Sequence, residues 1–289
     1  MHATIQKLLA EKPIITDGAW GTQLQARGLQ SGDFPDAWNL SHPDRVLEVA
    51  RAYVEAGSRI ILTNTFGANR LRLGETPFAA QVSIINQKGV EISRQAAKER
   101  ALVFASIGPT GKMLLAGETT PEELRSVFDE QAQALAKAGP DALVVETMAD
   151  LTEAEQAVRA ACATGLPVVA CMVFDSGKDK DRTMMGVTPE QAAEALTEAG
   201  AEVIGANCGQ GIAGFVPICR RLHAATDRPI WIKANAGLPR MKDGKPVYDT
   251  TPEQFAGYAK ELLAAGASFL GGCCGTSPEF IKVLKQTLA

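Results

Sequence analysis

Two adjacent cysteines, Cys273 and Cys274, lie in a glycine-rich segment at the end of an apolar run, and Cys208 ends another such run. Adjacent cysteines fit poorly into a disulfide framework, and in a reducing compartment clustered cysteines more often bind metal or carry out chemistry. Zinc binds thiolates at about 2.3 Å, and catalytic zinc sites commonly combine three protein ligands with one open position. If the fold brings them together, these three thiolates predict a zinc that binds a substrate sulfur.

The other cysteines, and the glycines around Cys273, have alternative explanations. Cys162, Cys171 and Cys219 fall inside predicted helices or strands, where cysteine is commonly a small buried residue. The segment 271–276 could instead cradle a phosphate, as glycine-rich loops at strand ends do. Two adjacent thiols would add nothing to that role, so zinc is the preferred interpretation.

Polar residues at other strand ends are candidates for substrate recognition. Asp17 and Glu146 each end an apolar run, where a carboxylate is unfavourable unless it is paired or reached by water. They could bind a substrate ammonium; alternatively, they could form structural ion pairs or cap a following helix. Thr65, Gly67 and Ala68 end the second run, and backbone N–H groups beside a glycine can hold a carboxylate.

Histidine chemistry is disfavoured by position, because His2, His42 and His223 all lie away from the predicted strand ends. This distribution argues against histidine-ligated zinc hydrolysis and against a cysteine–histidine nucleophile. Trp20 follows the first apolar run, and it could either form a wall of the pocket or pack in the core.

Eight short apolar segments alternate with longer helical stretches along the chain. The apolar segments are continuous inside, as parallel strands buried on both faces are. They span residues 14–20, 58–66, 102–109, 142–148, 167–174, 202–209, 229–236 and 267–275. The helical stretches have apolar residues three and four apart. They span residues 44–56, 78–99, 121–138, 151–164, 189–199, 215–225 and 252–265.

Eight strand-then-helix units predict an α/β fold, a single (β/α)8 barrel of the TIM type over residues 1–289. The alternative, an open doubly wound sheet, usually has a glycine-rich dinucleotide loop after its first strand, which the segment 17–21 does not match. In a barrel the carboxyl ends of the strands meet at one face, so the three strand-end cysteines are expected to converge there. The irregular segment 237–250 follows the seventh strand and is expected on the rim of that face.

Composition excludes several other classes of function. The formal net charge is −4, so no basic balance favours nucleic acid or an anionic membrane as a partner. No apolar run approaches the roughly 20 residues that a membrane-spanning helix needs. The first ten residues have the pattern of a short amphipathic helix rather than of a signal peptide, and a cytoplasmic location is therefore expected.

Six motifs, in order across nearly the whole chain, resemble the homocysteine S-methyltransferase family. They are Asp-Gly-Ala-Trp-Gly-Thr at 17–22, Thr-Asn-Thr-Phe-Gly-Ala-Asn at 63–69, Glu-Thr at 146–147, Gly-Ala-Asn-Cys-Gly at 205–209, Ala-Asn-Ala-Gly-Leu-Pro at 234–239 and Gly-Gly-Cys-Cys-Gly-Thr at 271–276. The combination of Asn-Cys with Gly-Gly-Cys-Cys-Gly is the specific part. The similarity looks closer to the homocysteine domain of cobalamin-dependent methionine synthase than to betaine–homocysteine methyltransferase.

The resemblance implies roles for individual residues. It implies Zn²⁺ on Cys208, Cys273 and Cys274, with Asn235 as a displaceable fourth ligand before the substrate arrives. It implies homocysteine as the methyl acceptor, with its ammonium at Asp17 and Glu146. The acceptor's carboxylate is implied near Gly67 and Ala68, with Thr65 in the same substrate-binding loop.

The methyl donor is open at this point. The chain ends after one barrel, so we expect the donor, a methylcorrinoid such as methylcobalamin, on a separate protein. S-methylmethionine and betaine are the alternative donors, although Trp20 and Trp38 are too few to predict the aromatic cage that a quaternary ammonium prefers. Two further hypotheses are a barrel lyase or aldolase and a non-catalytic zinc or thiol-binding module that serves a partner.

Overall fold

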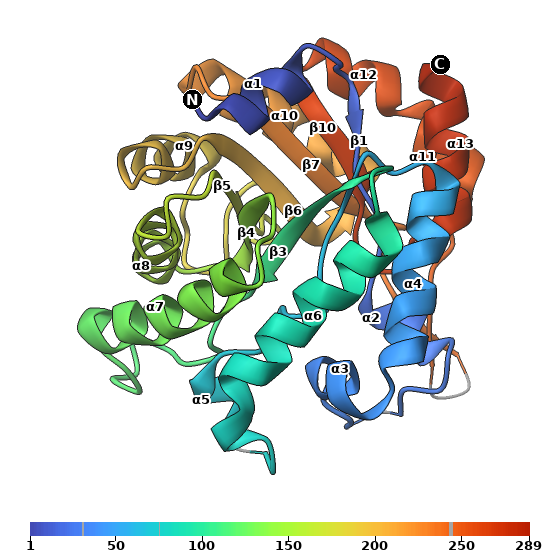
Figure 1. Ribbon diagram of the computed structural model, residues 1–289. Helices are drawn as coiled ribbons and strands as arrows, with labels where there is room; N and C mark the ends of the chain where they lie inside the picture. The colour runs from blue at the N-terminus through green and yellow to red at the C-terminus, as the bar shows by residue number, and fades with distance from the viewer. Residues whose placement is uncertain (31, 75, 243–244) are drawn as a thin grey trace.

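The computed structural model describes residues 1–30, 32–74, 76–242 and 245–289. Eight parallel strands form a nearly closed barrel (Figure 1), which confirms the predicted fold class. The strands are β1 (Ile14–Ile15), β2 (Ile60–Ile61), β3 (Leu102–Ile107), β4 (Ala142–Met148), β5 (Val168–Met172), β6 (Val203–Gly211), β7 (Ile230–Asn235) and β10 (Ala267–Gly272).

The strands follow one another around the barrel in the order β1-β10-β7-β6-β5-β4-β3-β2. A single parallel bridge between Thr16 and Ile60 joins the two ends of this series. Because β7 lies between β6 and β10, the ends of these three strands are neighbours. This order brings residues near 208 and 273 to the same face of the barrel.

The first two strands are shorter than predicted, at two residues each. Beyond β1 and β2, backbone N–H groups form hydrogen bonds with Asp17 in addition to those between neighbouring strands. The Leu62 N–H donates to Asp17 Oδ2 at 2.7 Å, and the Gly272 N–H donates to the Asp17 carbonyl at 3.0 Å. Asp17 therefore replaces part of the strand ladder, which an apolar pattern cannot reveal.

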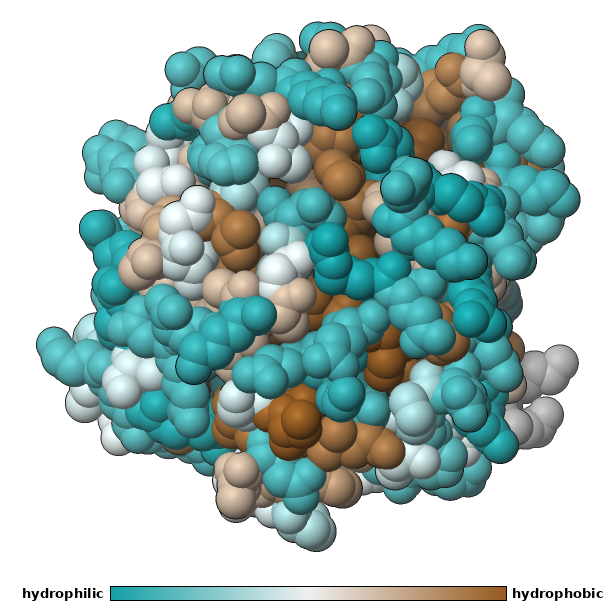
Figure 2. All heavy atoms as spheres, in the orientation of Figure 1, coloured by the Kyte–Doolittle hydropathy of each residue, from teal (hydrophilic) through white to brown (hydrophobic). Residues whose placement is uncertain are grey.

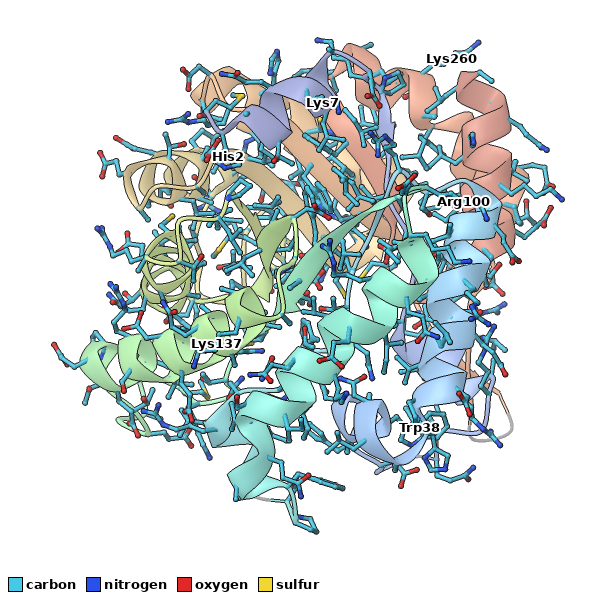
Figure 3. All side chains as sticks on the ribbon, viewed as in Figure 1. His2, Lys7, Trp38, Arg100, Lys137 and Lys260 are labelled. Carbon is cyan, nitrogen blue, oxygen red and sulfur yellow. The ribbon has the colours of Figure 1, made fainter. Side chains whose placement is uncertain are left out.

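The barrel interior is filled by large apolar side chains, including Phe104, Trp231 and Phe269. Helix α1 (Ala3–Leu9) adds Ile5 and Leu8 to this cluster. Figures 1 and 3 show α1, with the labelled His2 and Lys7, at the end where the strands begin. The helix closes that end of the barrel, which leaves the opposite end for the site.

An outer layer of helices surrounds the strands. The longer ones are α4 (Pro43–Ala56), α6 (Val82–Ala97), α7 (Pro121–Lys137), α8 (Leu151–Cys162), α9 (Pro189–Glu198), α10 (Ile212–Ala225) and α13 (Pro278–Leu288). Thr120 and Thr188 cap α7 and α9 through their side chains, and Pro occupies the first helical turn of both. On the face seen in Figure 2 hydrophilic residues predominate, and hydrophobic atoms show between them.

Several helix predictions needed adjustment. The predicted helix at 252–265 is two helices, α11 (Pro252–Gly257) and α12 (Ala259–Ala264), separated at Tyr258. Shorter helices that were not predicted are α2 (Gly21–Gln25), α3 (Trp38–Ser41), α5 (Arg70–Leu73) and the 3-10 turn Pro35–Ala37. The predicted helix at 78–99 begins with a 3-10 turn, Ala79–Gln81, before α6. Among the described residues, no helix has the length and apolar character that crossing a bilayer requires.

The segment 237–250, predicted to be irregular, contains a two-stranded antiparallel hairpin. Its strands are β8 (Arg240–Lys242) and β9 (Lys245–Val247), and residues 243–244 of the predicted loop lie outside the described part of the chain. The hairpin follows β7 directly, and it therefore stands at the same end of the barrel as the cysteines.

Candidate active site

The three strand-end cysteines lie together, as predicted. The Sγ atoms of Cys208, Cys273 and Cys274 are all within 4.8 Å of one another. Cys208 Sγ lies 3.8 Å from Cys274 Sγ. Sulfur atoms in a tetrahedral site with Zn–S bonds of about 2.3 Å are separated by about 3.8 Å. The cluster therefore has the spacing that a tetrahedral zinc requires.

The three thiols differ in pKa. Hydrogen bonds from Cys273 and Cys274 lower the pKa of Cys208 to about 3. The contact with Cys208 raises the pKa of Cys274 to about 12, and contacts with Cys208 and Cys274 raise the pKa of Cys273 well above its usual range. Of the three thiols, Cys208 is therefore the one that ionises most readily, and a metal that binds all three must displace the remaining thiol protons.

Asn235, the last residue of β7, also faces this cluster. Its side chain contacts Cys208 and contributes to the lowered pKa of that thiol. The Asn235 Oδ1 atom is buried and has no hydrogen-bond partner. A buried acceptor without a partner is unfavourable by roughly 1–3 kcal/mol. The three sulfurs form a donor set that fits a zinc ion, and Asn235 lies beside them.

Asn207 fixes the strand ends on which the site is built. Cys208 and Thr147 both have φ near +62°, in the left-handed region that residues with a Cβ rarely adopt. The Thr147 N–H donates to Asn207 Oδ1 at 2.7 Å, and Asn207 Nδ2 donates to Thr147 Oγ1 at 2.7 Å. This reciprocal pair stabilises two unusual backbone conformations beside the cysteines, as is common at functional sites.

A cavity of about 400 Å³ opens beside the cysteines. Its walls include all three cysteines, with Glu146, Lys233, Arg72 and the aromatic residues Trp20, Phe34 and Phe66. Of the predicted site residues, Gly67 and Glu146 also line it, whereas Asp17, Thr65, Ala68 and Asn235 lie behind its surface. Trp20 fulfils both alternatives considered from the sequence, because it lines the cavity and also packs against the core. Its indole N–H donates to Asp17 Oδ2 at 2.7 Å.

Glu146, at the end of β4, is the one carboxylate among the predicted residues that reaches the cavity. Ser106 Oγ donates to Glu146 Oε1, and Asn207 Nδ2 lies 3.4 Å from Oε2. Burial raises the pKa of this carboxyl, while nearby Lys233 and the Ser106 hydrogen bond oppose the shift. A cation brought to the weakly satisfied Oε2 would favour the ionised form.

Asp17 is completely buried and already has several partners. Lys233 Nζ contacts Asp17 Oδ1 in an ion pair, and both side chains are at most 2% exposed. The second oxygen accepts the hydrogen bonds from Trp20 and Leu62. The structural ion pair that the sequence left as an alternative for Asp17 is therefore present. Its partner is Lys233, which lies in the otherwise apolar strand β7.

The loop at residues 63–69 is supported from behind by buried amide side chains. Asn39 Nδ2 donates to the Asn64 carbonyl at 2.7 Å, and Gln131 Nε2 donates to the Thr65 carbonyl at 2.8 Å. Thr65 Oγ1 donates to the Ser106 carbonyl at 2.7 Å. Thr65 therefore holds the loop against β3, and it has no free hydroxyl proton for a ligand.

The backbone N–H of Gly67 already forms a hydrogen bond with a carboxylate of the protein itself. The Gly67 N–H donates to Asp36 Oδ1 at 2.9 Å, and the Ala68 N–H donates to the Thr65 carbonyl at 3.2 Å. A Cβ atom at Gly67 would lie 3.1 Å from Asp36 Oδ2 and 3.3 Å from Arg72 Nε. Arg72 forms no side-chain hydrogen bond or ion pair with any described residue, so its guanidinium is available to a ligand.

Asp36 gives the site a measurable pH signature. Burial raises the pKa of Asp36 to about 6, although the Gly67 hydrogen bond opposes the shift. Because the folded-state pKa lies above the ordinary value, stability from this group is complete below pH 4 and is lost as the pH rises through 6. Asp36→Asn keeps an acceptor for Gly67 and should raise the free energy of unfolding by up to about 3 kcal/mol at pH 8, and by about half of that at pH 5.

Urea unfolding at the two pH values measures this difference. Asp33→Asn is the matched control, because Asp33 is an exposed carboxylate in the same segment and should give the same small change at both pH values. An Asp36→Asn effect that did not depend on pH would contradict the assignment.

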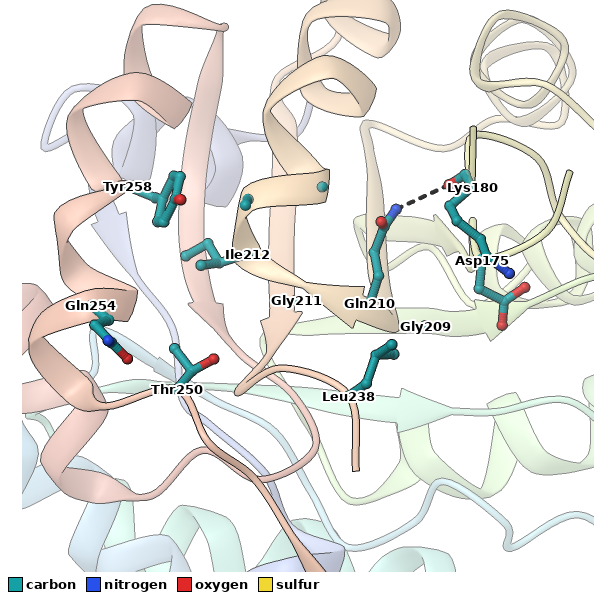
Figure 4. Close-up of a pocket in the computed structure, with 12 residues that line it drawn as sticks. Asp175, Lys180, Gly209, Gln210, Gly211, Ile212, Leu238, Thr250, Gln254 and Tyr258 are labelled. Carbon is teal, nitrogen blue, oxygen red and sulfur yellow. Dashed lines mark hydrogen bonds between the residues drawn. The ribbon is translucent and has the colours of Figure 1, made fainter. Parts of the chain in front are cut away.

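A second cavity, of about 610 Å³, is lined in part by residues at the end of β6 (Figure 4). Gly209, next to Cys208, lines it together with Leu238, Thr250 and Tyr258. The Gln210 amide donates to the Lys180 carbonyl at 3.0 Å across its edge, as the dashed line shows. This cavity contains none of the predicted site residues.

Comparison with known proteins identifies the family of this chain. The family model for homocysteine S-methyltransferase matches residues 14–288. Methionine synthase of Mycobacterium tuberculosis is 32% identical over 98% of this chain. Betaine–homocysteine S-methyltransferase 1 of Danio rerio is 28% identical over the whole chain and 76% of its own length. The chain spans about a quarter of the length of the mycobacterial methionine synthases that it matches.

A solved structure extends the comparison to the fold. The metallated form of the homocysteine methyltransferase MmuM from Escherichia coli superposes with a TM-score of 0.82 and is 25% identical. The superposition covers 98% of this chain and 99% of the MmuM chain. The family model, the methionine synthase match and the clustered cysteines agree, and this chain belongs to the homocysteine S-methyltransferase family.

Proposed function

We propose that this chain binds Zn²⁺ through Cys208, Cys273 and Cys274 and transfers a methyl group to the thiol of homocysteine, giving methionine. The observation that carries the proposal is the three-sulfur cluster at tetrahedral spacing, in the wall of a cavity large enough for an amino acid. When bound, zinc favours the thiolate form of a sulfur ligand, which is the nucleophilic form. The protein's part is to hold the acceptor so that its sulfur faces the donor's methyl group.

The acceptor's ammonium is proposed to bind Glu146. Glu146 lines the cavity, and its Oε2 atom has one long contact, 3.4 Å from Asn207. Asn235 is proposed as the ligand that leaves when the acceptor sulfur arrives, because its Oδ1 atom is unsatisfied. Asp17 is proposed to act indirectly, since Lys233 and Trp20 separate it from the cavity.

The acceptor's carboxylate is proposed to lie at the Gly67 loop, with Arg72 as its positive partner. The Gly67 N–H would become available if the carboxylate replaced Asp36, and Thr65 and Ala68 hold the loop in place. The planar guanidinium of arginine suits a carboxylate better than backbone amides alone do.

A methylcorrinoid, such as methylcobalamin on a separate protein, is the proposed donor. The methionine synthase identity of 32% exceeds the 28% to the betaine enzyme. Large apolar side chains are also exposed on the loops after β3, β5 and β7, including Leu115 (82%), Met184 (65%) and Met241 (71%). These loops share the end of the barrel where the site opens, and exposed apolar residues there suit a protein partner.

A small onium donor, such as betaine or S-methylmethionine, is the second candidate. The observation that favours it is the presence of Trp20, Phe34 and Phe66 in the cavity wall, a larger aromatic set than the sequence indicated. Aromatic faces attract quaternary ammonium and sulfonium groups. The volume of about 400 Å³ leaves room for such a donor beside homocysteine.

A donor panel tests both candidates. Zinc-loaded protein with homocysteine is given methylcobalamin, a methylated corrinoid protein, S-methylmethionine or betaine, and the methionine formed is measured. We expect turnover with the corrinoid donors. Turnover with betaine or S-methylmethionine alone would replace the donor assignment, and zinc binding without methionine from any donor would indicate a non-catalytic module.

We further propose that residues 1–289 form one barrel domain that carries the whole site. The six cysteines are free, which fits a reducing compartment such as the cytoplasm.

A further inference from the structure

Lys233 is a buried cation in the cavity wall that no step of the proposed reaction uses. It lies on β7, two residues before Asn235, and its side chain is 2% exposed. An uncompensated buried ammonium is strongly unfavourable, so the pairing of Lys233 controls the charge of the cavity.

Asp17 is the present partner of Lys233, and it offers little to any other group. Its Oδ1 atom contacts Lys233 Nζ, and its Oδ2 atom accepts hydrogen bonds from Trp20 Nε1 and the Leu62 N–H, each at 2.7 Å. Asp17 is completely buried and does not line the cavity, whereas Lys233 does. A ligand therefore meets Lys233 before it meets Asp17.

Glu146 is the other carboxylate that acts on Lys233. The two side chains line the same cavity, and each shifts the pKa of the other toward its charged form. Without Asp17, the ammonium of Lys233 would have Glu146 as its remaining carboxylate partner. It would then occupy the position proposed for the ammonium of the acceptor.

We propose that Lys233 is a positioning residue of the acceptor site: Asp17 holds its ammonium away from Glu146, so that Glu146 alone receives the acceptor's ammonium. The inference rests on the proposed binding of homocysteine. It assigns different roles to the two carboxylates, because Asp17 controls a lysine and Glu146 contacts the substrate.

A double-mutant cycle on the zinc-loaded protein tests this division. Asp17→Asn, Lys233→Met and the double variant are compared by calorimetric titration with homocysteine and by steady-state kinetics. We expect Asp17→Asn to weaken homocysteine binding by about tenfold or more, since the freed lysine competes for Glu146. The homocysteine KM should rise while the donor KM is unchanged. Adding Lys233→Met should restore the affinity to within about threefold of wild type.

The opposite pattern would overturn the inference. If Asp17 contacts the substrate directly, the double variant should bind homocysteine no better than Asp17→Asn. Failure of the wild-type protein to bind homocysteine would instead defeat the proposed function, and it is visible before any variant is compared.

Thermal unfolding provides a readout that does not need substrate. Lys233→Met leaves Asp17 buried and unpaired, so its melting temperature should fall, and the double variant should recover most of the loss. The exposed pair Glu11–Arg59 is the matched control, and its removal should change the melting temperature little. If Lys233→Met were as stable as wild type, the ion pair would not control this site.

Discussion

Replacing Cys208, Cys273 or Cys274 by serine is expected to remove the zinc and abolish methyl transfer. Each substitution exchanges a thiolate for a hydroxyl, a much weaker zinc ligand, within a cluster whose sulfurs lie within 4.8 Å of one another. Loss of an outer-shell partner typically weakens metal binding 10–100-fold, so loss of a direct ligand should weaken it by more than about 100-fold. Metal analysis of the purified variants and the rate of methionine formation measure both effects.

Cys162→Ser is the matched control for these variants. Cys162 ends α8, and its thiol donates to the Gly200 carbonyl at 3.4 Å, far from the cluster in the fold. This variant should keep about one zinc per chain and full activity. Zinc retained by any one of the three cluster variants at the wild-type level would show that the metal has other ligands.

Glu146→Gln is expected to have the second largest effect, on homocysteine binding. The substitution keeps the size of the side chain and its contact with Ser106, but removes the charge that faces the cavity. A hydrogen bond to a charged group contributes about 1.5–3 kcal/mol, so the dissociation constant of homocysteine should rise roughly 10- to 150-fold. Zinc content should not change, because Glu146 is not a member of the sulfur cluster.

Glu153→Gln separates this effect from the general loss of a buried carboxylate. Glu153 is 5% exposed and accepts hydrogen bonds from the Thr110 N–H and hydroxyl, outside the cavity. Its substitution should alter stability and leave homocysteine affinity unchanged. Equal losses of affinity in the two variants would mean that Glu146 does not contact the substrate.

The cysteine cluster could be predicted from the sequence because it depends on topology alone. Each of the eight apolar segments ends in residues that a parallel barrel must place at one face, and Cys208, Cys273 and Cys274 occupy such ends. The starts of α7 and α9 were also predictable, because a capping threonine followed by proline is a signal contained in the local sequence. These signals are Thr120-Pro121 and Thr188-Pro189.

The pairing of charges across the barrel could not be predicted in the same way. Lys233 interrupts an apolar strand, but the sequence does not say that its ammonium reaches Asp17, which is 216 positions away. The occupation of the Gly67 N–H by Asp36 likewise depends on how the segment after α2 folds back over the cavity. Such contacts follow from three-dimensional packing, whereas strand ends follow from the order of elements.

The strand lengths show the same limit. Strands of seven and nine residues were predicted at 14–20 and 58–66, with polar residues near their ends included. The ladder stops earlier because the Asp17 carboxylate and carbonyl take over hydrogen bonds that a neighbouring strand would otherwise make. A polar residue at the end of an apolar run therefore marks both the end of pairing and the beginning of the site.

The most direct test of the zinc–thiol assignment is X-ray absorption at the zinc edge, recorded on the wild-type protein with and without homocysteine. We expect three sulfur ligands at about 2.3 Å and one nitrogen or oxygen ligand before homocysteine is added, and four sulfur ligands afterwards. An unchanged number of sulfur ligands on adding saturating homocysteine would contradict the claim that this site activates the acceptor's thiol.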